Sequence, residues 1–174
     1  MGLLKIFASI LIVSSTSLIG YCFGNRYSTR LENLLHLEQC IKILETEIVY
    51  GAVPLPEALT NVYIKGNKKV SFIFEEIRRN LLNNRDGDLL KSFKMVSNQL
   101  TEQLSFKETD VELFLSLGRL LGSSDRSDQE KNFKLILKQI EILKNEAKIE
   151  MDRNEKVYKN LGVLAGITIV IILL

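Results

Sequence analysis

Apolar residues recur through the middle of the chain with a helical period, and no run alternates strictly between apolar and polar positions as a half-buried strand would. The clearest repeat has spacings of three and four residues and is formed by Leu34, Leu37, Ile41, Leu44 and Ile48. This narrow apolar seam predicts a long helix that packs along one side and ends near Gly51.

Turn residues divide the rest of the middle into further helices. We expect them over residues 56–65, 71–81, 88–104 and 109–122, followed by a last helix from residue 127 with no breaker before Gly162. Ser71 is placed to cap the second of these helices, and Thr109 and Ser127 each precede a glutamate by three residues, which is capping-box spacing.

The N-terminal end is an uncharged segment over residues 6–25, and a helix of 20 residues spans about 30 Å of hydrocarbon. The alternative is a cleaved signal peptide with Lys5 as its positive region, which the lack of a small-x-small cleavage site disfavours. A lipoprotein is disfavoured because Tyr21, rather than a small residue, precedes Cys22.

The C-terminal end, residues 160–174, is also uncharged but rises only about 22 Å as a helix. Adding Val157 and Tyr158, with Lys156 and Lys159 extending toward the headgroups, gives about 27 Å, which a slightly thinned bilayer accommodates. The alternative is a buried C-terminal core helix, and the absence of a polar face disfavours it.

The fold class we predict is all-α: an antiparallel helical bundle of about six helices with a transmembrane helix at each end. The predicted segments are an N-terminal transmembrane helix (1–25), a helical bundle with a charged stalk (26–159) and a C-terminal transmembrane helix (160–174). Lysine and arginine residues flank the inner ends of both spans, so the positive-inside rule places the bundle in the cytoplasm.

Charge is concentrated in that middle segment. Of the 44 charged residues, 43 lie between Arg26 and Lys159, of which 22 are basic and 21 acidic. This near balance excludes a strongly basic nucleic-acid binder. Two cysteines, Cys22 and Cys40, are too few for a disulfide scaffold and fit a reduced compartment.

No motif for a reaction is visible. The basic turn at residues 66–69 lacks the second glycine and the Ser/Thr of a phosphate loop, and residues 86–88 are too short for a calcium loop. The only histidine, His36, has Cys40 one turn on, which is a weak metal signal. We therefore expect a non-enzymatic protein with no catalytic, cofactor-binding or metal-binding residues.

Three longer patterns carry a resemblance to a known family. They are Pro54-Leu55-Pro56-Glu57-Ala58-Leu59, Leu117-Gly118-x-x-Leu121-Gly122-x-Ser124-Asp125-x-x-x-Gln129 and Tyr158-x-x-Leu161-Gly162-x-Leu164-x-Gly166. With a span at each end of a helical domain, the chain resembles the stage III sporulation protein AB family of endospore-forming bacteria over nearly its whole length. The family pattern often has a tryptophan in the fourth helix, and Phe93 is expected to take that packing role here.

The resemblance implies a membrane component of the mother-cell complex that joins the forespore, located in the mother-cell membrane facing the forespore. It implies a cytoplasmic domain similar to that of the type II secretion and type IV pilus platform protein. The implied partners are a secretion-type ATPase similar to stage III sporulation protein AA, other export-complex subunits and the membrane, but no nucleic acid. A homo-oligomer stays open, as does an adaptor or regulatory protein acting outside a secretion complex.

The residues carried over from these patterns are expected to be structural. They are Pro54, Pro56, Gly118, Gly122, Ser124, Asp125, Gln129, Gly162 and Gly166. The two prolines are expected to form a turn, Gly118 to allow close helix contact, Gly122 to terminate its helix, and Ser124 or Asp125 to cap the next one.

Overall fold

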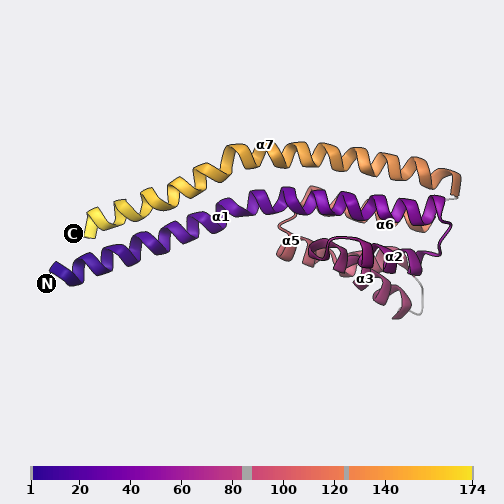
Figure 1. Cartoon of the computed structure of the whole chain (residues 1–174), viewed down its shortest axis with the longest axis horizontal. Helices are drawn as coiled ribbons and strands as arrows, with labels where there is room; N and C mark the ends of the chain where they lie inside the picture. Colours follow the sequence, from indigo (N-terminus) through magenta and orange to yellow (C-terminus); the bar gives the residue numbers. More distant parts are fainter. Residues whose placement is uncertain (1, 84–87, 124–125, 174) are drawn as a thin grey trace. The chain divides into compact units, whose positions relative to one another are not determined.

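Every regular element of the computed structural model is a helix within the residues that it describes, which are 2–83, 88–123 and 126–173 (Figure 1). In chain order the elements are α1 (Gly2–Glu45), the π-helix η1 (Thr46–Tyr50), α2 (Leu55–Lys65), α3 (Lys68–Asn83), α4 (Leu89–Met95), α5 (Ser97–Leu104), α6 (Glu108–Ser123) and α7 (Arg126–Leu173). The predicted all-α fold is confirmed. Neither predicted span is a separate element, because each one continues into a long helix.

The chain forms two compact units. Unit 1 consists of Met1–Leu31 and Glu146–Leu174, and unit 2 consists of Glu32–Asn145. Helices α1 and α7 each run from one unit into the other, so the chain enters and leaves unit 2 along helices rather than loops.

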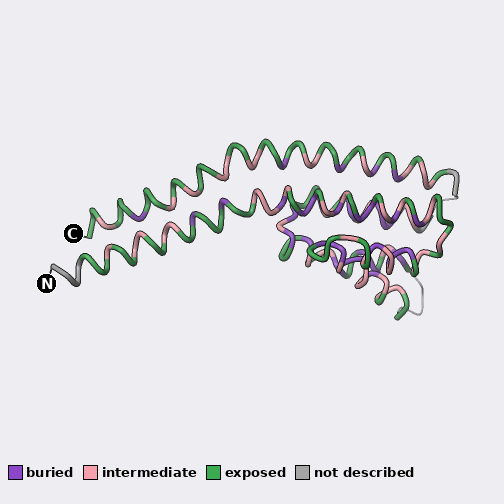
Figure 2. Tube along the Cα trace, in the orientation of Figure 1, coloured by how far each residue is buried: buried purple, intermediate pink, exposed green. Residues whose placement is uncertain are grey.

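Unit 2 has an apolar core. On α1 four residues of the predicted seam are buried, with Leu34, Leu37, Ile41 and Leu44 all 0% exposed, whereas the fifth, Ile48, lies in η1 and is half-buried. Helix α2 packs on α3, and α4 packs on both α3 and α6. Four phenylalanines fill the centre, namely Phe74, Phe93, Phe114 and Phe133. Figure 2 shows the buried positions recurring along one side of each helix, as the 3.6-residue period requires.

The helix predicted over residues 88–104 is divided in two at Val96. The N–H of Val96 bonds to the carbonyl of Phe93, three residues back, at 3.3 Å. Val96 therefore ends α4 and begins α5. The apolar period continues through this break, since Phe93, Val96 and Leu100 are all buried, and so the sequence pattern did not reveal it.

The three predicted N-caps are wrong, and one of them, Ser127, lies inside α7, which begins at Arg126. Helix α3 begins at Lys68, because the Asn67 side chain accepts a hydrogen bond from the Lys69 N–H at 2.9 Å. Ser71 lies inside the first turn and donates its hydroxyl to the Tyr63 carbonyl at 3.2 Å. Helix α6 likewise begins one residue before Thr109. At the starts of α3 and α6 a side-chain oxygen of a residue two or three positions away accepts a hydrogen bond from a backbone N–H group that has no partner within the helix.

At the start of α6 the acceptor is Asp110, whose carboxylate takes a hydrogen bond from the Lys107 N–H at 2.9 Å. Asp110 is 0% exposed. This bond fixes the chain direction where α5 turns into α6, after Ser105 has taken the left-handed conformation (φ 58°) that closes α5.

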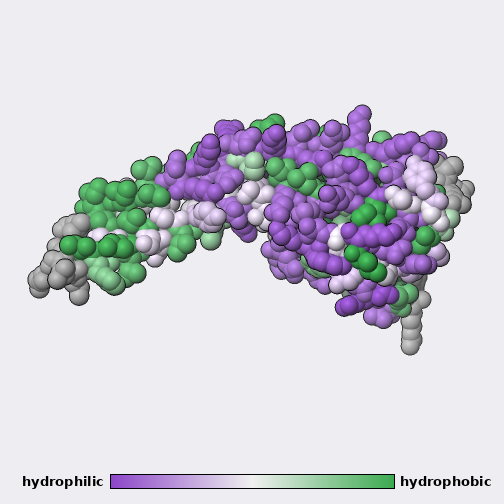
Figure 3. Space-filling model, in the orientation of Figure 1, coloured by the Kyte–Doolittle hydropathy of each residue, from purple (hydrophilic) through white to green (hydrophobic). Residues whose placement is uncertain are grey.

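Unit 1 is an antiparallel pair formed by the N-terminal part of α1 and the C-terminal part of α7. Both helices contain an apolar segment long enough to cross a membrane, and only 6% of each segment is buried. Figure 3 shows hydrophobic side chains gathered over these two helix ends. Large apolar side chains facing outward on a helix pair suit a lipid environment better than water.

Candidate functional site

The motif residues carried over from the sequence divide between the two units. Pro54, Pro56, Gly118 and Gln129 lie in unit 2, as does Gly122. Gly162 and Gly166 lie in unit 1. Ser124 and Asp125 lie outside the described residues, so their predicted capping role stays a prediction. Helix α6 continues through Gly122 to Ser123, one residue beyond the predicted terminus.

The first motif forms a tight reversal after α1. The π-helix η1 closes with a hydrogen bond from the Gly51 N–H to the Thr46 carbonyl at 2.9 Å. Ala52 then takes a left-handed conformation (φ 51°). This conformation is less favourable for alanine than for glycine, because it crowds the Cβ atom. Pro54 caps α2 and Pro56 occupies its first turn, where a missing N–H costs no hydrogen bond.

This reversal and the second motif border one hollow on the surface of unit 2. The hollow has a volume of about 310 Å³ and is lined by Ile48, Ala52, Val53, Leu55, Leu121 and Gln129. We call it the motif hollow. The proline turn contributes Leu55, and the glycine-rich motif contributes Leu121 and Gln129, so two patterns about seventy residues apart in the sequence meet at one place. No pattern in the sequence indicated that these two motifs would lie together.

Gln129 connects this hollow with the core. It also borders a smaller, partly open space between α6 and α7, lined with Leu117, Leu120, Leu121, Asn132, Phe133 and Ile136. Five of the six residues that line the motif hollow have apolar side chains, but polar atoms make up about half of its exposed surface. Such a surface can receive an apolar side chain of another protein.

Charged groups anchor the turn on its other side. Glu47 accepts hydrogen bonds from Lys65 at 2.6 Å and Asn61 at 2.7 Å, and these donors lower the pKa of its carboxyl group. Burial raises the pKa of Glu45, one residue before η1, with the nearby Lys134 opposing the shift. Glu47 therefore fixes η1 against α2.

Gly118 permits a close contact, as predicted. A Cβ at this position would lie 2.7 Å from Cγ of Phe93, so the ring of Phe93 rests directly on the backbone of α6. The same ring packs against Phe114 with centroids 4.9 Å apart, and Phe114 meets Phe74 edge-on at 6.1 Å. Phe93 therefore occupies a central packing position.

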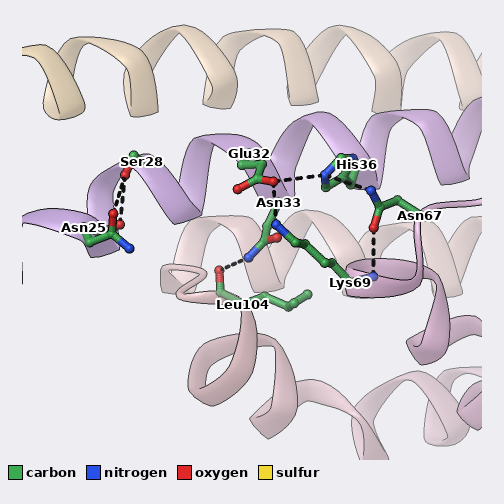
Figure 4. A network of polar contacts seen from close by, with 8 residues as sticks. All are labelled: Asn25, Ser28, Glu32, Asn33, His36, Asn67, Lys69 and Leu104. Atoms are coloured by element: carbon green, nitrogen blue, oxygen red, sulfur yellow. Dashed lines mark hydrogen bonds and ion pairs between the residues drawn. The ribbon is translucent and has the colours of Figure 1, made fainter. Parts of the chain in front are cut away.

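No group of three His, Cys, Asp or Glu side chains among the described residues is arranged to hold a metal ion. Nε2 of His36 lies 3.2 Å from the Asn67 amide nitrogen, and burial raises the pKa of the Cys40 thiol to about 12, which makes it a poor ligand at neutral pH. Figure 4 shows these contacts, with Lys69 bound to Glu32 at 2.7 Å. They hold α1 to the turn between α2 and α3.

The motif glycines of unit 1 lie directly against α1, Gly162 on Gly20 and Gly166 on Thr16 and Val13. A Cβ on Gly20 would lie 2.7 Å from the Cα of Gly162, and one on Gly166 would meet Thr16 and the Cα of Val13. Gly24 is equally close to the backbone carbonyl of Glu155, at 2.8 Å. Both helices thus carry glycines four residues apart, the spacing that lets apolar helices touch backbone to backbone. Sequence reasoning missed Gly20 and Gly24, although this G-x-x-x-G spacing could have identified them.

Next to the glycine contact, α1 and α7 also meet through aromatic and charged side chains. The ring of Tyr158 stacks between Phe23, at 6.4 Å, and Tyr27, at 5.7 Å. Arg30 is 3% exposed and pairs with Glu150 at 2.8 Å. Burial raises the pKa of the Tyr27 hydroxyl, so it stays neutral beside this ion pair.

Comparison with known proteins agrees with these patterns. The family model described as stage III sporulation protein AB matches residues 5–174. The chain is similar to the stage III sporulation protein AB of Bacillus subtilis (strain 168), with 29% identity over 173 residues that cover 99% of this chain and 100% of that protein. It is also similar to a solved structure of stage III sporulation protein AB (SpoIIIAB), with a TM-score of 0.63 and 26% identity, covering 70% of this chain and 95% of that one.

Proposed function

Because the chain belongs to the stage III sporulation protein AB family, we propose that it is a non-enzymatic platform of the channel between mother cell and forespore. In this role unit 2 couples a cytoplasmic secretion-type ATPase, similar to stage III sporulation protein AA, to the membrane assembly. The protein resides in the mother-cell membrane facing the forespore.

One observation carries this proposal. The motif hollow brings together Leu55 from the proline turn and Leu121 and Gln129 from the glycine-rich motif on the surface of unit 2. These residues come from separate parts of the sequence, and a helical scaffold holds them in place. A hollow lined by apolar side chains and polar atoms in about equal area is suited to binding an amphipathic segment of a partner.

The two ends of the chain support a membrane location. Both apolar segments are exposed, and they pair through glycines, which is how helices associate in lipid. Arg26 and Arg30 follow the first segment, and Arg153, Lys156 and Lys159 precede the second, which by the positive-inside rule supports a cytoplasmic unit 2, accessible to an ATPase.

The test is site-specific crosslinking in sporulating cells. A photo-reactive amino acid at Leu55 should crosslink the ATPase, whereas the same amino acid at Leu82, which is 60% exposed on α3, should not. The proposal predicts that Leu55→Arg prevents copurification of the ATPase while the protein stays membrane-bound. Ile64→Arg, a matched change at a position that is 63% exposed, should leave copurification intact.

Two results would contradict the platform role. One is an absence of any crosslink from the motif hollow to the ATPase or another export-complex subunit. The other is full sporulation of a strain carrying Leu55→Arg with the normal protein level. Crosslinks only to proteins outside the export complex would instead support an adaptor or regulatory protein.

A further inference from the structure

Besides Lys148, three exposed cations of unit 1 have no ionic partner among the described residues. Arg30 and Lys159, by contrast, pair with Glu150 at 2.8 Å and with Glu155 at 2.6 Å. The three others are Arg26, Arg153 and Lys156, and all are exposed. We call them the cationic collar. The exposed carboxylate of Asp152 offsets part of their charge, which leaves a net excess of two.

Two of the collar residues lie next to the ends of the apolar segments, and Arg153 lies about two helical turns before the second segment. Arg26 is the first charged residue after the uncharged stretch 6–25, and Lys156 is four residues before the uncharged stretch that begins at Asn160. Each neighbours an aromatic residue of the stacked group, Tyr27 on α1 and Tyr158 on α7.

A second contact indicates where the membrane headgroups lie along the two helices. The ammonium group of Lys159 lies 4.8 Å from the ring centroid of Tyr21. Tyrosine side chains concentrate at the headgroup level of membranes because the ring is apolar and the hydroxyl polar. Tyr21, Tyr27 and Tyr158 therefore mark the headgroup layer, and the collar falls within it or directly beside it.

We propose that the cationic collar binds the headgroups of anionic phospholipids, a claim that rests on the membrane location proposed above. The charges are complementary, because a phosphatidylglycerol headgroup is an anion and the collar residues have no competing ionic partner within the part of the chain that the structure describes. Each Lys or Arg near an anionic membrane surface favours binding by roughly fivefold. An acidic segment of another protein would carry the same charge, but it would have to displace lipid from this layer.

Native mass spectrometry on the full chain tests this. The protein is purified in neutral detergent containing equal amounts of dioleoyl-phosphatidylglycerol and dioleoyl-phosphatidylcholine, and the bound lipids are counted. The intact protein should retain phosphatidylglycerol preferentially. The combined variant Arg26→Gln, Arg153→Gln and Lys156→Gln should lose that preference by roughly tenfold or more, because three attractive charges are removed. Added salt should weaken the preference of the intact protein.

The matched control removes the same number of charges from unit 2. Its changes are Lys91→Gln, Lys94→Gln and Lys138→Gln, all at exposed positions. This control should keep the phosphatidylglycerol preference. An equal loss in both variants, no loss in the collar variant, or no preference in the intact protein would each overturn the inference. Loss of a protein partner by the collar variant without a change in lipid binding would overturn it too.

Failure of the collar and failure of the membrane location give different results. Extraction of the intact protein from membranes by alkaline carbonate would contradict the spanning helices themselves. Resistance to extraction together with equal binding of both lipids would contradict only the collar.

Discussion

Units 1 and 2 are both helical, but they hold their helices together in opposite ways. In unit 1 the approach of α1 and α7 is limited by backbone atoms, since Gly20 and Gly162 leave no room for a Cβ between them. In unit 2 the helices are separated by large side chains, and Phe93 and Phe114 are fully buried between them.

The solvent explains this difference. In water, burying apolar side chains is favourable by about 25 cal/mol for each Å² removed from the solvent, so unit 2 gains most from large residues at its helix contacts. Lipid offers no such gain, because its chains are as apolar as leucine, and helices associate there by close van der Waals contact. The glycines of unit 1 and the phenylalanines of unit 2 therefore perform the same task in two environments.

The largest effect should follow from emptying the unit 2 core. Phe114→Ala removes a ring that contacts both Phe74 and Phe93, and we expect the free energy of unfolding to fall by about 3–5 kcal/mol. Urea titration of the full chain in mild detergent, followed by circular dichroism, measures it. Leu82→Ala, at a position that is 60% exposed, serves as control and should change stability by no more than about 0.5 kcal/mol. Similar losses from both variants would show that unit 2 is not held by this core.

The matching change in unit 1 adds a side chain where none fits. Gly162→Ile should separate α1 from α7, at a cost of about 1–3 kcal/mol in pairing, because the branched side chain meets backbone atoms that cannot rotate away. Oxidative crosslinking between cysteines at Phe23 and Tyr158, in a chain with Cys22→Ser, should fall severalfold while the urea midpoint of unit 2 stays unchanged. Ala165→Ile, at an exposed neighbouring position, should keep the crosslink. An unchanged crosslink in Gly162→Ile would refute the glycine contact.

A smaller effect concerns pH and belongs to unit 2 alone. Burial raises the pKa of the Cys40 thiol from its ordinary 9.0 to about 12, so above pH 9 the unfolded chain releases this proton first. The stabilisation is complete below pH 9 and is lost as pH rises toward 12, at up to about 1.4 kcal/mol per pH unit. Urea titrations over this range should show a shallower pH dependence in Cys40→Ala than in the intact protein. Parallel slopes would mean that the thiol is not buried in solution.

The smallest effect should come from the surface of unit 2. Lys69 pairs with Glu32 at 2.7 Å, but the two side chains are 61% and 50% exposed. We expect Lys69→Ala to lower stability by no more than about 0.5 kcal/mol, because water and salt screen exposed pairs. The same urea titration detects this. A loss comparable to that of Phe114→Ala would indicate that polar contacts, rather than the core, hold α1 to the turn after α2.

Local sequence patterns predicted most of the fold. The seam from Leu34 to Leu44 is buried as expected, and the turn at Pro54 and Pro56 ends one helix and begins another. Predictions failed where two nearby residues could both cap a helix. Ser71 was predicted to cap α3, but the side-chain oxygen of Asn67 accepts the hydrogen bond from the Lys69 N–H group instead. They also failed at Val96, where the helix breaks without disturbing the apolar period.

The sequence by itself determined that the chain is helical and that its two ends differ from its middle, because periodicity and the absence of charge are properties of neighbouring residues. Only the tertiary structure decided that Leu55 meets Leu121 and Gln129, and that Gly20 meets Gly162. These contacts join residues that lie far apart along the chain. They depend on the direction in which each helix leaves its turn, which no local pattern specifies.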